Sequence, residues 1–240
     1  MKFHRETAEI FVPDGLPTEA ALARTTHMAI GAHQDDLEIM AFDGILKCFQ
    51  RQDRWFTGVV VTNGAGSPRA DLYADYTDEA MQVVRRKEQK KAAVIGDYAA
   101  QVLLDYPSAV LKNGADQSPV EDLLTLFAWA HPEIIYTHNL ADKHDTHVAV
   151  TLRVIEALRR RQGLGDGRKA FRGVVTEWRP AEGGRVLLLQ PHTFMNLSGQ
   201  SAGECATFHK VPPADVLVVL DDLALPLGTL RARAQGSSGG

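Results

Sequence analysis

Cysteine is scarce in this sequence. Its 240 residues include two cysteines, Cys48 and Cys205, which stand far apart and outside any Cys-x-x-Cys or Cys/His finger spacing. A disulfide-rich secreted domain and a thiolate zinc site both need more cysteines at closer spacing. We therefore expect both side chains to be buried as small apolar groups.

Long apolar runs and an excess of basic residues are also missing. No run approaches the length of a membrane-spanning helix, and residues 1–9 have mixed charge without the apolar core of a secretory signal. Lysine and arginine number 26 against 30 aspartates and glutamates, a balance atypical of a protein built mainly to bind nucleic-acid backbones. These absences favour a soluble protein of the reducing cytoplasm, with no membrane partner.

Strand-like apolar segments alternate with helical patterns over the first two thirds of the chain. The expected strands cover 26–32, 56–62, 98–105 and 132–137, and the expected helices cover 38–51, 77–95, 119–130 and 146–161. A short helix over 19–24 lies in an otherwise irregular lead-in. Strands separated by helices pair in parallel, so we predict an α/β fold with a Rossmann-like, doubly wound, mostly parallel sheet.

The composition changes near residue 160. Residues 159–168 form a charged, glycine-rich stretch with the composition of a linker. Beyond it we expect a helix over 196–210 and strands over 185–190, 215–220 and 229–234. The sequence thus predicts a first domain over 1–162, followed by a smaller α/β segment over 163–240.

The turn after the first expected strand holds an unusual group of polar residues. His33, Asp35 and Asp36 follow the apolar run 28–30. Because unpaired buried charge is costly, a histidine with two adjacent carboxylates is poor core material, but together they suit a cation. The alternative for either aspartate is an ordinary helix N-cap. We interpret the turn as one half of a metal site.

A second histidine-rich segment follows the strand expected over 132–137. Because the carboxyl ends of parallel strands face a common crevice, the two segments can meet there. A hydrolytic metal needs protein ligands and an open position for water. We expect His33, Asp36 and His147 to supply those ligands.

We expect other polar residues of these segments to act beside the three metal ligands. Asp35 is the candidate general base, and His144 is expected to stabilise an oxyanion or to protonate a leaving amine. Glu38 lies in the first turn of the next helix and is expected to support the site from outside the ligand set. His138 and Asp142 stay open between supporting partners and surface residues.

Two motifs resemble those of a known family. Ala32-His33-Gln34-Asp35-Asp36-Leu37-Glu38 and His144-Asp145-Thr146-His147 resemble the A-H-x-D-D-x-E and H-x-x-H motifs of LmbE-like (PIG-L) zinc-dependent N-acetylglucosaminyl deacetylases. The resemblance spans about residues 20–160. It implies an amide hydrolase that removes acetyl from a GlcNAc-type sugar conjugate, with Zn²⁺ on the three ligands named above and Asp35 as base.

Further positions extend this resemblance or depart from it. Arg85 and Glu88 match a family R-x-x-E pattern, which implies that Arg85 approaches the substrate. Gln34 stands where the family usually has proline. The aspartate of the second motif is Asp145 instead of the residue just before the metal histidine, and we expect Asp145 to support His144.

The end of the chain resembles a different family. Residues 190–201, with the string T-F-M-N-L-S-G, and residues 219–228 closely resemble bacterial peptidyl-tRNA hydrolase. The resemblance implies that Asn196 contacts the substrate and that Asp221 corresponds to the aspartate that orients a catalytic histidine. That histidine has no counterpart here, Ala224 replaces a usual acidic residue, and the segment lacks the basic excess of a tRNA-binding surface.

Three functional hypotheses remain open at this point. The first is a zinc-dependent deacetylase carried by residues 1–162, acting on a small-molecule GlcNAc-type conjugate. The second is a peptidyl-tRNA hydrolase or tRNA-binding module carried by the incomplete segment 163–240. The third is a hybrid chain with neither activity.

Overall fold

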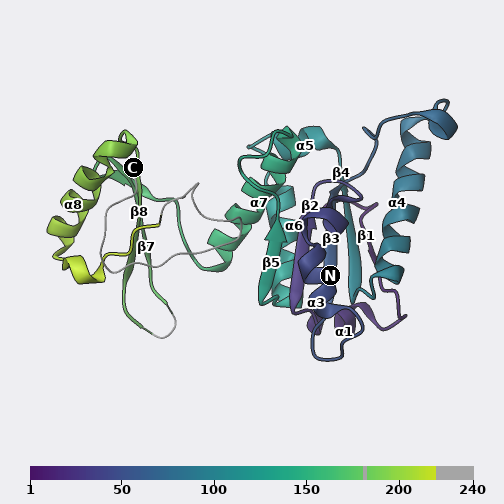
Figure 1. Cartoon of the computed structure of the whole chain (residues 1–240), viewed down its shortest axis with the longest axis horizontal. Helices are drawn as coiled ribbons and strands as arrows, with labels where there is room; N and C mark the ends of the chain where they lie inside the picture. The colour runs from purple at the N-terminus through teal and green to yellow at the C-terminus, as the bar shows by residue number, and fades with distance from the viewer. Residues whose placement is uncertain (181–182, 220–240) are drawn as a thin grey trace. The chain divides into compact units, whose positions relative to one another are not determined.

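A five-stranded sheet forms the framework of the amino-terminal part of the chain (Figure 1). The computed structural model describes residues 1–180 and 183–219. The chain divides into two compact units, Met1–Gly165 and Asp166–Gly240. The strands of the first unit are β1 (Glu9–Phe11), β2 (His27–Gly31), β3 (Phe56–Thr62), β4 (Ala100–Tyr106) and β5 (Ile134–Thr137).

The strand order of this sheet is β1-β4-β3-β2-β5. β4, β3, β2 and β5 pair in parallel, and β1 alone pairs antiparallel, against β4. All residues of β2, β3 and β4 are buried, because helices cover both faces of the sheet. The predicted α/β fold with a mostly parallel sheet is confirmed.

The helices form two layers with separate hydrophobic cores. One core contains residues of α1 (Thr18–Ala23), α5 (Ser108–Lys112), α6 (Ser118–Ala130) and α7 (Asp145–Arg161). The other contains residues of α2 (Asp36–Met40), α3 (Phe42–Cys48) and α4 (Asp78–Ile95). A short 3-10 helix, η1 (Asp71–Tyr73), precedes α4. The doubly wound arrangement brings the loops after β2 and β5 to the same edge of the sheet, because these strands are parallel neighbours.

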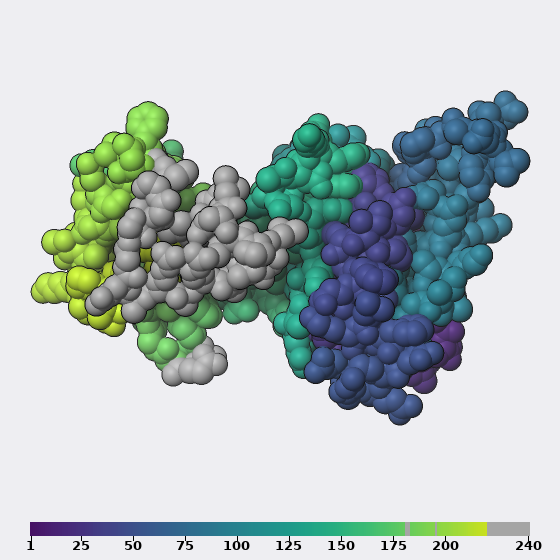
Figure 2. Space-filling model, viewed as in Figure 1, coloured from purple at the N-terminus to yellow at the C-terminus, as the bar shows by residue number. Residues whose placement is uncertain are grey.

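The helix expected over 38–51 is instead two short helices, α2 and α3. Ala41 separates them with φ −114° and ψ 19°, outside the helical region. The break changes which side chains face the sheet: Leu37 and Ile45 are buried, whereas Ile39, Phe42 and Leu46 are exposed. The part of the chain that carries these helices lies on the face toward the viewer in Figure 2, in blue-purple. The helical spacing of Ile39, Phe42, Ile45 and Leu46 predicted one helix, and of these four side chains Ile45 alone is buried.

The second unit contains an antiparallel sheet of three strands and one longer helix. The strands are β6 (Arg168–Ala170), β7 (Gly173–Trp178) and β8 (Val186–Pro191), in that order. α8 (Ser198–His209) follows η2 (Met195–Leu197), and η3 (Pro213–Asp215) follows α8. Val175 and Cys205 are buried, but every residue of β8 keeps part of its surface exposed to solvent within the described structure.

Several expectations for this unit are confirmed and others are wrong. β8 and α8 lie where a strand over 185–190 and a helix over 196–210 were expected. The strand expected over 215–220 is wrong for its described residues, since η3 ends at Asp215 and residues 216–219 are irregular. The strand expected over 229–234 lies outside the described residues. β6 and β7 were not predicted.

No helix in the described part of the chain combines the length and the apolar character needed to cross a bilayer.

Candidate metal centre

The turn after β2 places a histidine and a carboxylate against each other. The backbone N–H of His33 donates a hydrogen bond to Asp36 Oδ2 at 2.6 Å, which closes the turn. Asp35, between them, is the N-cap residue of α2, yet its carboxylate makes no capping hydrogen bond with the described residues. Its φ of 101° lies in the left-handed region, which is unusual for a residue with a side chain. The turn therefore holds the Asp36 carboxylate against His33, whereas the Asp35 carboxylate takes no part in closing the turn.

The start of α7 places three more side chains at the same edge of the sheet. His144 is the N-cap residue, and its Nδ1 accepts a hydrogen bond from Thr146 N at 3.3 Å. His147 lies in the first turn of α7, and its Nδ1 lies 3.0 Å from Asp142 Oδ2. Because Nδ1 of His147 faces this carboxylate, Nε2 is the nitrogen that can bind a metal ion.

The three expected metal ligands converge. His33 Nδ1 lies 3.2 Å from His147 Nε2 and 3.4 Å from Asp36 Oδ2. His147 Nε2 lies 3.4 Å from Asp36 Oδ1. Ligand atoms held about 2.1 Å from a tetrahedral zinc are about 3.4 Å apart. The donor set and its spacing therefore fit zinc, although the role of the three residues as ligands stays a prediction.

His138 and His144 also border this cluster. Their ring nitrogens belong to two groups that could hold a metal ion, one of His33, His144 and His147 and one of Asp36, His138 and His147. His138 is buried, and its Nε2 accepts a hydrogen bond from Ala32 N at 2.9 Å. That contact uses the lone pair a metal would need, so His138 is better suited to fixing the turn than to binding the ion.

The electrostatics of the cluster favour an ionised Asp36 and a neutral His144. Burial raises the pKa of the Asp36 carboxyl. Contacts with His138 and His33 lower this pKa by more than burial raises it, so that the pKa falls well below the usual range. Partial burial and the neighbouring His147 and His33 lower the pKa of His144. Because Nδ1 of His144 accepts a backbone hydrogen bond, its proton is placed on Nε2, which can donate to an oxygen.

The candidate base is paired with the arginine of the R-x-x-E pattern. Arg85 Nη2 lies 2.9 Å from Asp35 Oδ2, and Arg85 Nη1 donates to Glu88 Oε2 at 2.7 Å. Arg85 also donates to the carbonyl oxygen of Gln34. The side chain of Asp35 is 62% exposed, so it can be reached from solvent. The structure thus joins the two residues expected to act on substrate, and their roles stay predictions.

The two residues expected to support the site differ in their surroundings. Glu38 Oε1 accepts hydrogen bonds from Gln89 Nε2 at 2.9 Å and from Tyr98 Oη at 2.8 Å, beneath the β2–α2 turn. Asp145 has a side chain that is 84% exposed, and its carboxylate lies 3.9 Å from Lys112 Nζ. Between the two acidic residues near the start of α7, Asp142 is the one that contacts a site histidine, and the sequence left its role open.

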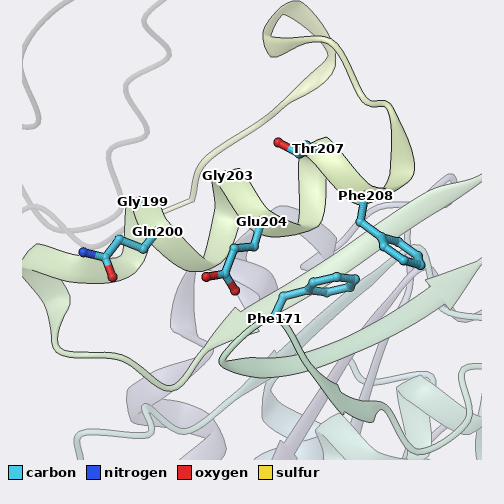
Figure 3. Close-up of a pocket in the computed structure, with 7 residues that line it drawn as sticks. All are labelled: Phe171, Gly199, Gln200, Gly203, Glu204, Thr207 and Phe208. Carbon is cyan, nitrogen blue, oxygen red and sulfur yellow. The ribbon is translucent and has the colours of Figure 1, made fainter.

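Of the two residues singled out in the second unit, the structure describes Asn196. Asn196 is exposed on η2, and Asp221 lies outside the described residues. A surface hollow beside α8 is lined by Phe171, Gly199, Gln200, Gly203, Glu204, Thr207 and Phe208 (Figure 3). The Glu204 carboxylate pairs with Arg172 at 2.8 Å, so this acidic group is already engaged.

Comparison with protein families separates the two parts of the chain. The PIG-L family model, described as GlcNAc-PI de-N-acetylase, matches residues 28–158, which include every residue of the candidate metal centre. The peptidyl-tRNA hydrolase model matches residues 139–240. The two matches overlap over 139–158, the segment that contains His144 and His147.

Curated relatives match the carboxyl-terminal part. The chain is 46% identical over 88 residues to the peptidyl-tRNA hydrolase of Symbiobacterium thermophilum, covering 36% of this chain and 47% of that protein. It is 52% identical over 75 residues to the peptidyl-tRNA hydrolase of Desulfitobacterium hafniense, covering 31% of this chain and 40% of the relative. The chain therefore spans less than half the length of these relatives.

A solved structure resembles the chain in fold. N,N'-diacetylchitobiose deacetylase from Pyrococcus horikoshii shares 16% identity with a TM-score of 0.50, over 80% of this chain and 72% of that one. At this identity the likeness concerns the fold alone. The family match covers more than half of the chain and includes both sequence motifs, so the chain belongs to the PIG-L family of de-N-acetylase-type hydrolases.

Proposed function

We propose that the first unit is a zinc-dependent amide hydrolase that removes an N-acetyl group from a GlcNAc-type sugar conjugate. The observation that carries this proposal is the convergence of His33, Asp36 and His147, whose facing ligand atoms lie 3.2 to 3.4 Å apart. Membership of the PIG-L family supports the acetylated amino sugar as substrate class. The net reaction consumes one water and yields acetate and a free amine.

Zinc is the metal that this donor set favours. Two imidazole nitrogens and one carboxylate leave a fourth position open, an arrangement typical of hydrolytic zinc sites. When bound, zinc supplies a Lewis acid that polarises the acetyl carbonyl and lowers the pKa of water. Asp142 orients His147 through its Nδ1, and His138 fixes the turn through Ala32.

The exposed polar residues around the cluster carry out the proton transfers. Asp35 accepts the proton of the attacking water and returns it to the leaving amine nitrogen as the C–N bond breaks. His144 stabilises the oxygen of the tetrahedral intermediate through its Nε2–H, because its Nδ1 already accepts a hydrogen bond from Thr146 N. Arg85 holds the Asp35 carboxylate in place through Nη2.

Metal analysis combined with acetate release tests this proposal. We expect the purified full chain to bind close to one zinc per molecule and to release acetate from an N-acetylglucosamine conjugate. A chelator should abolish that release, and added zinc should restore it. H147A should lose both zinc and activity, whereas H192A, which removes an exposed histidine of the second unit, should retain both.

Protein that neither holds nor regains zinc would contradict the proposal. So would acetate release that continues unchanged in the presence of the chelator.

A second candidate activity rests on the carboxyl-terminal match. The 46% identity to a peptidyl-tRNA hydrolase supports cleavage or binding of N-acyl-aminoacyl-tRNA by residues 163–240. This segment lacks a counterpart of the family's catalytic histidine, so we rank it second. Cleavage that survives the chelator and is lost in N196A would favour it, and absence of both cleavage and tRNA binding would dismiss it.

A further inference from the structure

The backbone of Asp35 adopts a conformation that needs external support. Its φ of 101° places a residue with a side chain in the left-handed region, where such residues are unfavourable. The local turn does not remove this cost, because the hydrogen bond from His33 N goes to Asp36. Contacts from elsewhere in the fold must therefore hold the residue that the proposed function uses as its base.

One helix supplies such contacts at two points. Arg85 and Gln89 are four residues apart on α4, so they project from the same face of the helix. Arg85 Nη2 contacts the Asp35 carboxylate at 2.9 Å. Gln89 Oε1 accepts a hydrogen bond from Asp35 N at 3.2 Å. The helix therefore binds Asp35 by its carboxylate and by its backbone.

The orientation of the Gln89 amide is determined by its surroundings. Gln89 is 1% exposed, and its Nε2 donates to Glu38 Oε1 at 2.9 Å and to Gln101 Oε1 at 3.2 Å. Both partners are acceptors, and Glu38 Oε1 also accepts from Tyr98 Oη. A rotated amide would point Nε2 at the N–H of Asp35 and Oε1 at the Glu38 carboxylate, so the observed orientation is the satisfied one.

We propose that Gln89 is a positioning residue, which holds the left-handed turn of Asp35 through its backbone N–H and is itself oriented by Glu38. The proposal rests on the proposed function. It adds to the site a residue of α4, the helix that follows β3. Glu38 would support the base through Gln89, without touching the metal ligands.

A purely structural role for Gln89 is the competing explanation, and Gln101 provides the matched control. Gln101 is also a fully buried glutamine and belongs to the same amide chain, but it contacts Gln89 and not Asp35. Q89M and Q101M each replace a buried amide with an apolar group of similar size. Both remove a hydrogen bond of the network, whereas only Q89M removes the acceptor of Asp35 N–H.

The test combines amide hydrogen exchange with steady-state kinetics on the zinc-loaded full chain. In the wild type we expect the Asp35 amide to exchange at least about 10-fold more slowly than an unprotected amide, the effect of one hydrogen bond. Q89M should remove that protection and lower kcat about 10- to 100-fold, with KM and bound zinc nearly unchanged. Q101M should keep the protection and a kcat within about 2-fold of wild type.

Each alternative outcome overturns a definite statement. An unprotected Asp35 amide in the wild type overturns the positioning role without any variant, even if Q89M does not fold. Equal kcat losses in Q89M and Q101M assign Gln89 a structural role only. A wild-type chain without zinc-dependent acetate release contradicts the proposed function, whereas an active wild type with an unimpaired Q89M overturns the positioning role alone.

Discussion

The metal centre depends on individual atoms brought together from distant positions. His33 and His147 are 114 residues apart in the chain, yet their ring nitrogens lie 3.2 Å from each other. The choice of nitrogen follows from the second contact of each ring: Asp142 holds Nδ1 of His147, and Thr146 N holds Nδ1 of His144. In both histidines Nδ1 is therefore engaged by the protein, and Nε2 is the nitrogen that remains for a metal ion or a substrate.

The two aspartates near the start of α7 allow a matched comparison. Asp142 accepts from His147 Nδ1 and from His144 N, whereas Asp145 is largely exposed beside Lys112. We predict that D142A weakens zinc affinity about 10- to 100-fold, because His147 loses the carboxylate that orients it. D145A should leave zinc affinity within about 2-fold. Competition titration with a chromogenic chelator measures both, and the reverse order of effects would contradict this assignment.

The sequence singled out three residues that lie together in the structure, but it did not indicate most of the contacts that hold them. His33, Asp36 and His147 are recognisable because charged residues at strand ends have few roles other than binding. Gln89 is one polar residue among many on α4, and nothing in the local pattern indicates that it contacts Asp35. Likewise, the assignment of Asp142 over Asp145 depends on how the loop after β5 enters α7. These contacts depend on tertiary packing.

At the scale of the elements, burial decided which predictions succeeded. β3 and β4 are buried along their whole length, so their apolar runs were recognised. β1 has three partly buried residues and forms by pairing with β4. No local sequence pattern predicts this pairing. The α2–α3 break at Ala41 involves neither proline nor glycine, so no helix-breaking residue indicated it.

A glycine in β3 permits the close packing beneath the β2–α2 turn. A Cβ added to Gly58 would lie 2.5 Å from Gln101 Oε1 and 2.8 Å from Leu37 Cδ1. We predict that G58A lowers the free energy of unfolding by about 1–3 kcal/mol, since a buried site must rearrange to admit the methyl group. G114A, whose added Cβ meets no described atom within 4 Å, should change it by less than about 0.5 kcal/mol. Urea denaturation compares them, and equal effects would refute the packing argument.

The amino-terminal segment is joined to α6 by a contact that depends on pH. His4 Nδ1 lies 2.7 Å from Asp122 Oδ1, and this hydrogen bond raises the pKa of His4 in the folded state. The stabilisation is complete below the unfolded pKa of about 6.5 and is lost as pH rises through the higher folded value. We predict that H4A costs a few tenths of a kcal/mol more at pH 5.5 than at pH 8.5, a small effect because His4 is half exposed. Urea unfolding at both pH values checks this, and a pH-independent cost would contradict it.

At the scale of the whole molecule, two units with different family matches share one chain. The first contains the candidate metal centre and matches the PIG-L model over 28–158. The second matches peptidyl-tRNA hydrolase, although the chain spans about half or less of the length of the curated relatives it resembles. We propose that residues 1–162 carry the deacetylase domain and that residues 163–240 are a partial peptidyl-tRNA-hydrolase-like segment.

The proposed function depends on a zinc site shared by the β2–α2 turn and the first turn of α7. Anomalous diffraction at the zinc edge from crystals of the zinc-loaded full chain tests it directly. We predict one strong peak about 2.0–2.2 Å from His33 Nδ1, an Asp36 carboxylate oxygen and His147 Nε2. A map without a peak among these atoms, or with zinc held by other residues, would contradict the proposed zinc site.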